Sequence, residues 1–111
     1  MTKIEITEDE NVYTVKLGST IIAENARAKS LAEGSYPPVL YFDPATLDRS
    51  GFTKSTHQTH CPHKGDASYY NVTLDGKTYE NVAWVYEDPF DKAQAVKSHL
   101  AFYPVVEISL T

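Results

Sequence analysis

Turn-forming residues interrupt this chain at short intervals and leave little room for long helices. Pairs such as Gly18-Ser19, Asp43-Pro44 and Asp75-Gly76 separate short segments in which polar and apolar residues alternate. Alternation with a period of two is typical of half-buried strands, and Asp-Gly between two such segments is a strong signal for a β-hairpin. The chain therefore predicts a mainly β fold, a compact antiparallel sheet or barrel-like domain.

The pattern assigns most of the chain to strands. We expect them at residues 3–7, 12–17, 20–24, 39–42, 52–58, 67–74, 77–79, 81–86 and 105–110, with the first two joined as a hairpin and a loop at 59–65. Residues 25–33 have helical spacing and predict one or two helical turns. A C-terminal helix is expected at about 91–100, with Ala93, Val96 and Leu100 facing inward. The class is thus a β-rich α+β fold in a single domain of residues 1–111.

Composition excludes several classes of protein. The 111 residues carry a net charge of −5 without a run of Lys or Arg, which argues against tight binding to duplex nucleic acid. A single cysteine excludes an intramolecular disulfide and favours a reducing compartment. The first residues lack the apolar core of a signal peptide, and no apolar run approaches the roughly 20 residues of a membrane helix. We therefore expect a cytoplasmic protein that does not contact membranes.

Reactive side chains gather between Ser55 and Tyr70, which hold three of the four histidines and the only cysteine. Cys61 precedes Pro62 and lies close in sequence to His60 and Lys64. Cationic neighbours favour the thiolate form, so Cys61 is a candidate nucleophile with His60 as its general acid or base. The alternative is that Cys61 is a small buried apolar residue, which is common for free cysteine.

The same segment contains a set of groups that zinc favours, namely His57, His60, Cys61 and His63. Their spacing matches no standard zinc finger. In an extended segment, alternate side chains face opposite sides, so the four groups do not converge easily. The sequence thus predicts no metal site, and it indicates no particular cofactor.

Lys64-Gly65 is the stronger binding candidate. Gly65 allows the backbone to turn sharply, so that Lys64 can present its charge to a phosphate or carboxylate. Several aromatic side chains are candidates for the walls of such a pocket: Tyr69, Trp84, Tyr86 and Tyr103. The alternative for these rings is the hydrophobic core, which is where most aromatic side chains lie.

The order of the segments resembles a known family. The matching residues are Ala23-Glu24, Leu31-Ala32-Glu33, Tyr36-Pro37, Tyr41-Phe42, the run from Thr59 to Tyr69, Asn81 to Tyr86 with Pro89, and Ala101-Phe102-Tyr103. Over nearly its whole length, the chain resembles the domain of unknown function 427 family, which also carries a nucleotidyltransferase label. The resemblance implies a largely β domain with a helix near the C-terminus. Mapped onto this sequence, the family motif points at Cys61, Lys64, Gly65, Tyr69, Trp84 and Tyr86.

Three functional hypotheses follow. The first is a domain that binds a small anionic ligand in an aromatic-lined pocket, with Lys64 holding the anion. The second is a thiol- or nucleotide-handling enzyme that uses Cys61, His60 and Lys64; nucleotidyl transfer usually needs several metal-binding carboxylates, and Asp66 is the one acid within the motif. The third is a structural or interaction module, in which exposed strand edges pair two copies into a homodimer.

Overall fold

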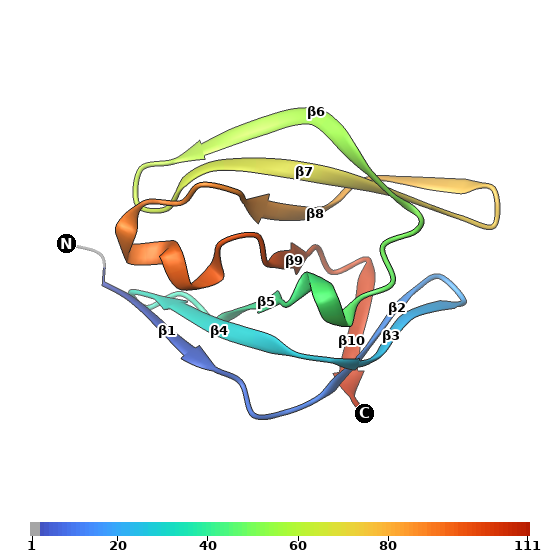
Figure 1. The fold of residues 1–111 in the computed structure, drawn as a ribbon, viewed down its shortest axis with the longest axis horizontal. Helices are drawn as coiled ribbons and strands as arrows, with labels where there is room; N and C mark the ends of the chain where they lie inside the picture. Colours follow the sequence, from blue (N-terminus) through green and yellow to red (C-terminus); the bar gives the residue numbers. More distant parts are fainter. Residues whose placement is uncertain (1–2) are drawn as a thin grey trace.

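The computed structural model describes residues 3–111 and is mainly β, as the sequence predicts (Figure 1). Met1 and Thr2, which the predicted domain includes, lie outside the described residues. The elements follow the chain in this order: β1 (Ile4–Glu8), β2 (Tyr13–Leu17), β3 (Thr20–Ala26), β4 (Ala28–Glu33), β5 (Val39–Phe42), the 3-10 helix η1 (Pro44–Thr46), β6 (Phe52–Cys61), β7 (Gly65–Leu74), β8 (Lys77–Tyr86), the 3-10 helix η2 (Asp91–Val96), β9 (Leu100–Phe102) and β10 (Val106–Leu110). Within this range, no helix has the length and apolar character needed to cross a membrane.

The described strands form two antiparallel sheets. The larger has the order β1-β4-β5-β9-β8-β7-β6, and the smaller has the order β10-β2-β3. The larger sheet bends round, so that β6, β7 and β8 form an upper layer and β1, β4 and β5 a lower one, with β9 between them (Figure 1). The η2 segment lies at the left end of this arrangement, and the smaller sheet lies at the lower right.

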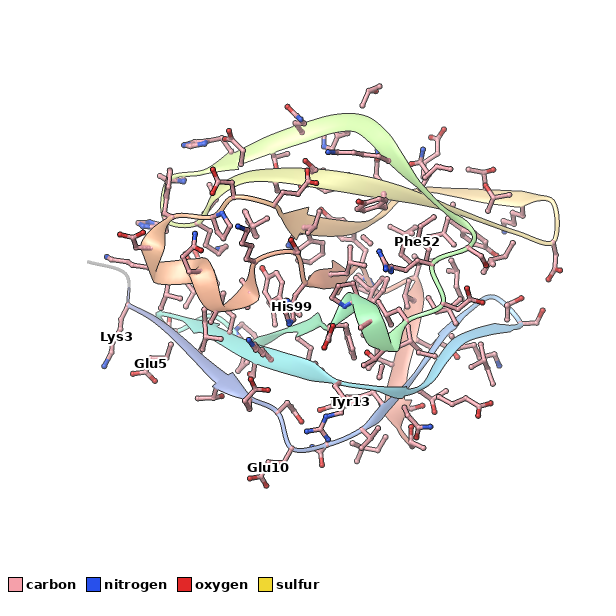
Figure 2. All side chains as sticks on the ribbon, in the orientation of Figure 1. Lys3, Glu5, Glu10, Tyr13, Phe52 and His99 are labelled. Atoms are coloured by element: carbon pink, nitrogen blue, oxygen red, sulfur yellow. The ribbon has the colours of Figure 1, made fainter. Side chains whose placement is uncertain are left out.

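Buried residues on the two faces of the larger sheet belong to two apolar clusters. The first packs the smaller sheet against residues such as Phe42, Val72 and Val85. The second gathers the aromatic residues Tyr41 and Tyr86 with the two buried residues of η2. Polar side chains such as Lys3, Glu5 and Glu10 point away from the body of the molecule at its lower edge (Figure 2). Within one strand, neighbours such as Tyr41 and Phe42 belong to different clusters, because successive side chains of a strand point to opposite faces of the sheet.

The predicted hairpin between residues 3–7 and 12–17 is wrong. β1 pairs with β4, where Ile6 lies opposite Leu31, and β2 pairs with β3. The helical turns expected at 25–33 are also absent, because this segment forms the end of β3 and the whole of β4. The alanines and Leu31 favour a helix locally, but β1 and β5 on either side of β4 supply hydrogen bonds and cover for an extended chain.

The C-terminal helix expected at 91–100 is a 3-10 helix that ends at Val96. Ala93 and Val96 are buried as predicted. Ser98 then adopts a left-handed backbone conformation with φ +62°, and Leu100 begins β9 opposite Phe42 and Val85. The chain must return to the sheet within a few residues, which leaves no room for a longer helix.

Two other expectations are confirmed. The strand at Val39–Phe42 has the predicted bounds, and Asp75-Gly76 joins β7 to β8 as a hairpin. The loop expected at 59–65 is shorter, since β6 continues to Cys61 and β7 starts at Gly65. The motif between them is therefore a tight turn at the end of two long strands.

Candidate functional site

The turn that joins β6 to β7 holds the CPHKG motif, which is residues 61–65, in one defined geometry. Cys61 lies opposite Gly65 in the antiparallel ladder, and the backbone N–H of Lys64 donates to the carbonyl oxygen of Cys61 at 3.3 Å. From outside the turn, the N–H of Phe90 donates to the carbonyl oxygen of Lys64 at 2.9 Å. Gly65 has φ +115°, a conformation that L side chains rarely adopt. The backbone thus fixes the position from which Lys64 extends.

Lys64 forms an ion pair with Glu33, the last residue of β4. Only 12% of the Lys64 side chain and 16% of the Glu33 side chain are exposed. The ammonium group also lies 6.0 Å from the centre of the Tyr86 ring, within the range of a cation–π contact. The pair therefore connects the turn of the upper layer to the lower layer of the sheet.

The electrostatics of this pair keep the lysine charged. Burial is the largest single influence on the pKa of Lys64 and lowers it. The hydrogen bond that Lys64 donates to Glu33 and the nearby charges outweigh burial, so that the pKa of Lys64 lies above its ordinary value. At neutral pH, the site thus contains a mostly buried ammonium group held in place by a carboxylate.

A hollow of about 460 Å³ opens beside the ion pair. Its apolar lining comes from the end of β4, from β5 and from the segment between them. Its polar groups are those of Glu33, Lys64 and the two tyrosines. The lining residues are Leu31, Glu33, Tyr36, Pro37, Pro38, Val39, Tyr41 and Lys64. Tyr36 is 73% exposed and stands at the rim. Proline and aromatic side chains keep this surface rigid. The volume lies within the range of small-molecule sites, which is roughly 300–1,000 Å³.

Tyr41 links the hollow to the rest of the second core. Its side chain is buried, and its hydroxyl oxygen accepts a hydrogen bond from Nε1 of Trp84 at 3.3 Å. Burial raises the pKa of Tyr41, and burial likewise raises the pKa of Tyr86. Both phenols therefore remain protonated at neutral pH.

The predicted aromatic residues form one cluster next to this hollow. The ring of Trp84 lies 4.8 Å from that of Tyr103, measured between centroids, and Tyr103 stacks on Tyr69 at 6.5 Å. Tyr69 in turn contacts the ring of His57 at 4.5 Å. Tyr86 joins the cluster through Tyr41, at 6.3 Å. The structure thus brings Tyr69, Trp84, Tyr86 and Tyr103 together, but of the predicted binding residues only Lys64 belongs to the lining of the hollow.

Cys61 and His60 lie on opposite sides of β6. Cys61 is half-buried and packs against the second core, near Lys64. His60 points outward, where its Nδ1 lies 2.7 Å from the carboxylate of Asp66 and its ring lies 6.3 Å from that of Phe90. Adjacent residues of a strand face opposite sides, so this geometry does not favour direct proton transfer between His60 and the thiol.

The histidines of the motif are likewise spread out. His57 lies against Tyr69, whereas His63 lies with Pro62 at a shallow hollow near η2. Across residues 3–111, no three His, Cys, Asp or Glu side chains lie close enough together to hold a metal ion.

Glu33 and Tyr41 are the site residues that reasoning from the motif alone does not find. Glu33 is 31 positions from Lys64 in the sequence, and no local pattern joins them. A usable signal is present nevertheless: both residues fall within segments that match the family pattern, Leu31-Ala32-Glu33 and Tyr41-Phe42. Segments shared with the motif's family are candidates for contact with the motif in space.

Comparison with known proteins confirms the family resemblance seen in the sequence. The family model NTP_transf_9, described as a domain of unknown function (DUF427), matches residues 5–110. No curated protein matches the chain.

Proposed function

The chain belongs to the DUF427 family, and on that premise we propose that it binds a small anionic ligand in the hollow beside Lys64. The observation that carries the proposal is a charged, mostly buried ammonium group at the side of an apolar hollow of about 460 Å³. A cation in such surroundings attracts an anion more strongly than one in water, because the local dielectric constant is lower.

Lys64 is prepared for this role by its neighbours. An ammonium group has three N–H donors, and among residues 3–111 Glu33 is its hydrogen-bond acceptor. The Tyr86 ring and the tight turn limit the directions in which the side chain can move. The entropy cost of ordering Lys64 is therefore met on folding rather than on binding.

Glu33 already occupies the position at Lys64 that an anionic ligand needs. Its carboxylate neutralises Lys64, so an incoming anion meets a pair whose net charge is close to zero. We infer that the ligand's anionic group takes the place of the Glu33 carboxylate at the ammonium. The apolar part of the ligand then lies on the surface formed by Pro37, Pro38 and Val39. A phosphate or carboxylate attached to an apolar or aromatic group satisfies both requirements.

The test is a thermal-shift screen of nucleotides, phosphorylated sugars and aromatic or aliphatic carboxylates, followed by calorimetric titration of the compounds that stabilise the protein. We expect one class to bind, Lys64→Met to abolish binding, and Glu33→Gln to strengthen it about tenfold by removing the competing carboxylate. Lys54→Met is the matched control, because Lys54 also pairs with a glutamate, Glu87, but on an exposed surface. Unchanged affinity in Lys64→Met contradicts the proposal, as does the absence of any stabilising compound. Weaker binding in Glu33→Gln contradicts the exchange.

A second candidate function is self-association through β10. This strand is the edge of the smaller sheet, and apolar side chains at and beside it are exposed: Val105, Ile108 and Leu110. Antiparallel pairing of two copies centred on Ile108 places Glu107 opposite Ser109, so no like charges face each other directly. Sedimentation measurements should show a concentration-dependent dimer that Ile108→Lys dissociates. A monomer at all concentrations contradicts this function.

A further inference from the structure

A second hollow, of about 290 Å³, lies on the other face of the larger sheet from Lys64. Its lining comes from the start of η1, the chain leading into β6, and β7, β8 and β9; the residues are Pro44, Arg49, Phe52, Tyr70, Val85, Glu87, Ser98 and Leu100. Val85 and Leu100 belong to the first apolar cluster, whereas Tyr41 and Tyr86 belong to the second. The two hollows are therefore separate sites.

This second hollow carries charges of both signs. Oε1 of Glu87 accepts hydrogen bonds from Nζ of Lys54 at 2.6 Å and from Oγ of Ser68 at 3.1 Å. The bond from Lys54 lowers the pKa of Glu87, so its carboxylate is ionised at neutral pH. Arg49 supplies a guanidinium group, and it forms no ion pair with any residue in the range 3–111. An available cation and a fixed anion thus share one small space.

The floor between these charges is apolar. Val85 and Leu100 are each 3% exposed, and the ring of Phe52, labelled at the start of β6 in Figure 2, lies 6.1 Å from that of Tyr70. The volume lies near the lower limit of small-molecule sites, which is roughly 300 Å³. These dimensions suit a compact molecule with one aliphatic group.

Ser98 adds a polar group in an unusual backbone conformation. Its φ of +62° is rare for a residue other than Gly, Asn or Asp, and its N–H donates to the carbonyl oxygen of Tyr86 at 3.0 Å. Strained positions of this kind are enriched at ligand sites, where the surrounding structure maintains them. Ser98 lines the same hollow as Arg49 and Glu87.

We propose that this hollow binds a zwitterionic α-amino acid with an aliphatic side chain. Arg49 holds the carboxylate through paired N–H donors, the free oxygen of Glu87 accepts from the ammonium, and the side chain lies on Val85 and Leu100. Opposite charges on one ligand match opposite charges on one site, so each analogue that lacks a charge leaves one protein group without its partner. The proposal is independent of the function proposed for the Lys64 hollow.

The experiment is a titration of the ¹⁵N-labelled protein with L-leucine, followed by amide NMR shifts, with N-acetyl-L-leucine and L-leucinamide alongside. N-acetylation removes the positive charge of the ligand, and the amide removes the negative charge. We expect saturable shifts at Phe52, Ser98 and Leu100, and affinities at least about tenfold weaker for both analogues. If either analogue binds as tightly as L-leucine, the ligand does not need both charges and the proposal is wrong. If no saturable shifts occur, or if they are confined to residues around Lys64, the proposal that this hollow binds the amino acid is wrong.

Variants then assign the two charges. Arg49→Gln and Glu87→Gln should each weaken L-leucine binding at least about tenfold. Lys3→Gln is the matched charge control, since Lys3 precedes β1 at the opposite edge of the sheet and is 79% exposed. Ser98→Gly should raise the melting temperature by relieving backbone strain. Wild-type affinity in both Arg49→Gln and Glu87→Gln contradicts the proposal.

Discussion

Lys64 and Glu33 form a mostly buried ion pair that joins the β6–β7 turn to the end of β4, across 31 positions of sequence. Such a pair has two consequences. It holds the two layers of the larger sheet in a fixed relation at this point, and it places a charged group beside an apolar hollow. The first consequence concerns stability and the second concerns binding, and variants of the two residues separate them.

Breaking this pair from one side should destabilise the fold. Lys64→Met leaves a carboxylate in a site where it is 16% exposed, and Glu33→Gln leaves the ammonium without its partner. Removal of one partner from a fully buried pair costs about 3–5 kcal/mol. Since some exposure remains here, we expect about 2 kcal/mol from each single variant, measured by denaturant unfolding.

The double variant Glu33→Gln/Lys64→Met provides the check on this interpretation. It removes both charges together, so its loss of stability should be smaller than the sum of the single losses. Lys3→Met, which breaks the exposed pair between Lys3 and Glu5, serves as a control and should leave stability unchanged. Additive losses in the double variant would show that the two residues act independently.

Gly65→Ala should damage the site through the backbone. An added Cβ would meet its nearest neighbours at 3.5 Å, which is ordinary contact, so space is not the problem. The φ of +115° is the problem, because an L residue is strained there. We expect a loss of about 2 kcal/mol in the free energy of unfolding.

Gly76 offers the matched comparison for that substitution. It lies in the β7–β8 turn with φ +77° and has no atom within 4 Å of an added Cβ. Asn tolerates a left-handed conformation, so Gly76→Asn should cost less than about 1 kcal/mol. If the two substitutions lowered the free energy of unfolding by the same amount, the claim that the backbone of Gly65 makes a side chain costly there would be wrong.

Local signals in the sequence predict the local part of this structure. Asp75-Gly76 determines a two-residue hairpin, and the β-branched and aromatic run at Val39–Phe42 determines a buried strand. The pairing of β1 with β4 is non-local, and no short-range signal favours it over a hairpin between neighbours. Residues 25–33 have helical preferences that the strands on either side override.

The candidate site shows the same division. The CPHKG turn is evident from the residue types, because Pro, Lys and Gly stand between two alternating segments. Its partner Glu33 is invisible to that reasoning, since it comes from a segment that looks helical and pairs across the bent sheet. The sequence predicts four aromatic residues as pocket walls, yet all four cluster beside the hollow and none of them lines it.

Stability should fall in alkaline solution because buried tyrosines resist ionisation. Burial raises the pKa of Tyr41 and of Tyr86 in the folded protein, whereas an unfolded tyrosine ionises near pH 10. Above about pH 10 the unfolded chain therefore binds fewer protons than the folded one, and the free energy of unfolding decreases as the pH rises. Below that pH the phenols are protonated in both states, and the free energy of unfolding keeps its full value. Each tyrosine that stays protonated in the folded protein adds at most about 1.4 kcal/mol per pH unit to the decline.

Tyr86→Phe should remove about 1 kcal/mol of this decline between pH 10 and pH 11. Denaturant unfolding at a series of pH values measures the slope directly. Tyr36→Phe is the control, because Tyr36 is 73% exposed and its environment changes little on unfolding. A Tyr86→Phe slope identical to that of the wild type would show that this phenol is not protected by the fold.

Trp84 reports on the second core, since it is the only tryptophan in the chain. Its Nε1 donates to the hydroxyl of Tyr41, and its ring contacts that of Tyr103 at 4.8 Å. Tyr41→Phe removes the acceptor from a partly buried N–H and should cost about 1 kcal/mol, measured by denaturant unfolding.

Tyr103→Ala uncovers the indole of Trp84, and the fluorescence emission of Trp84 should move to longer wavelength as water reaches it. An emission maximum unchanged by Tyr103→Ala would mean that Tyr103 does not shield Trp84 from water in solution, and it would contradict the contact between the two rings.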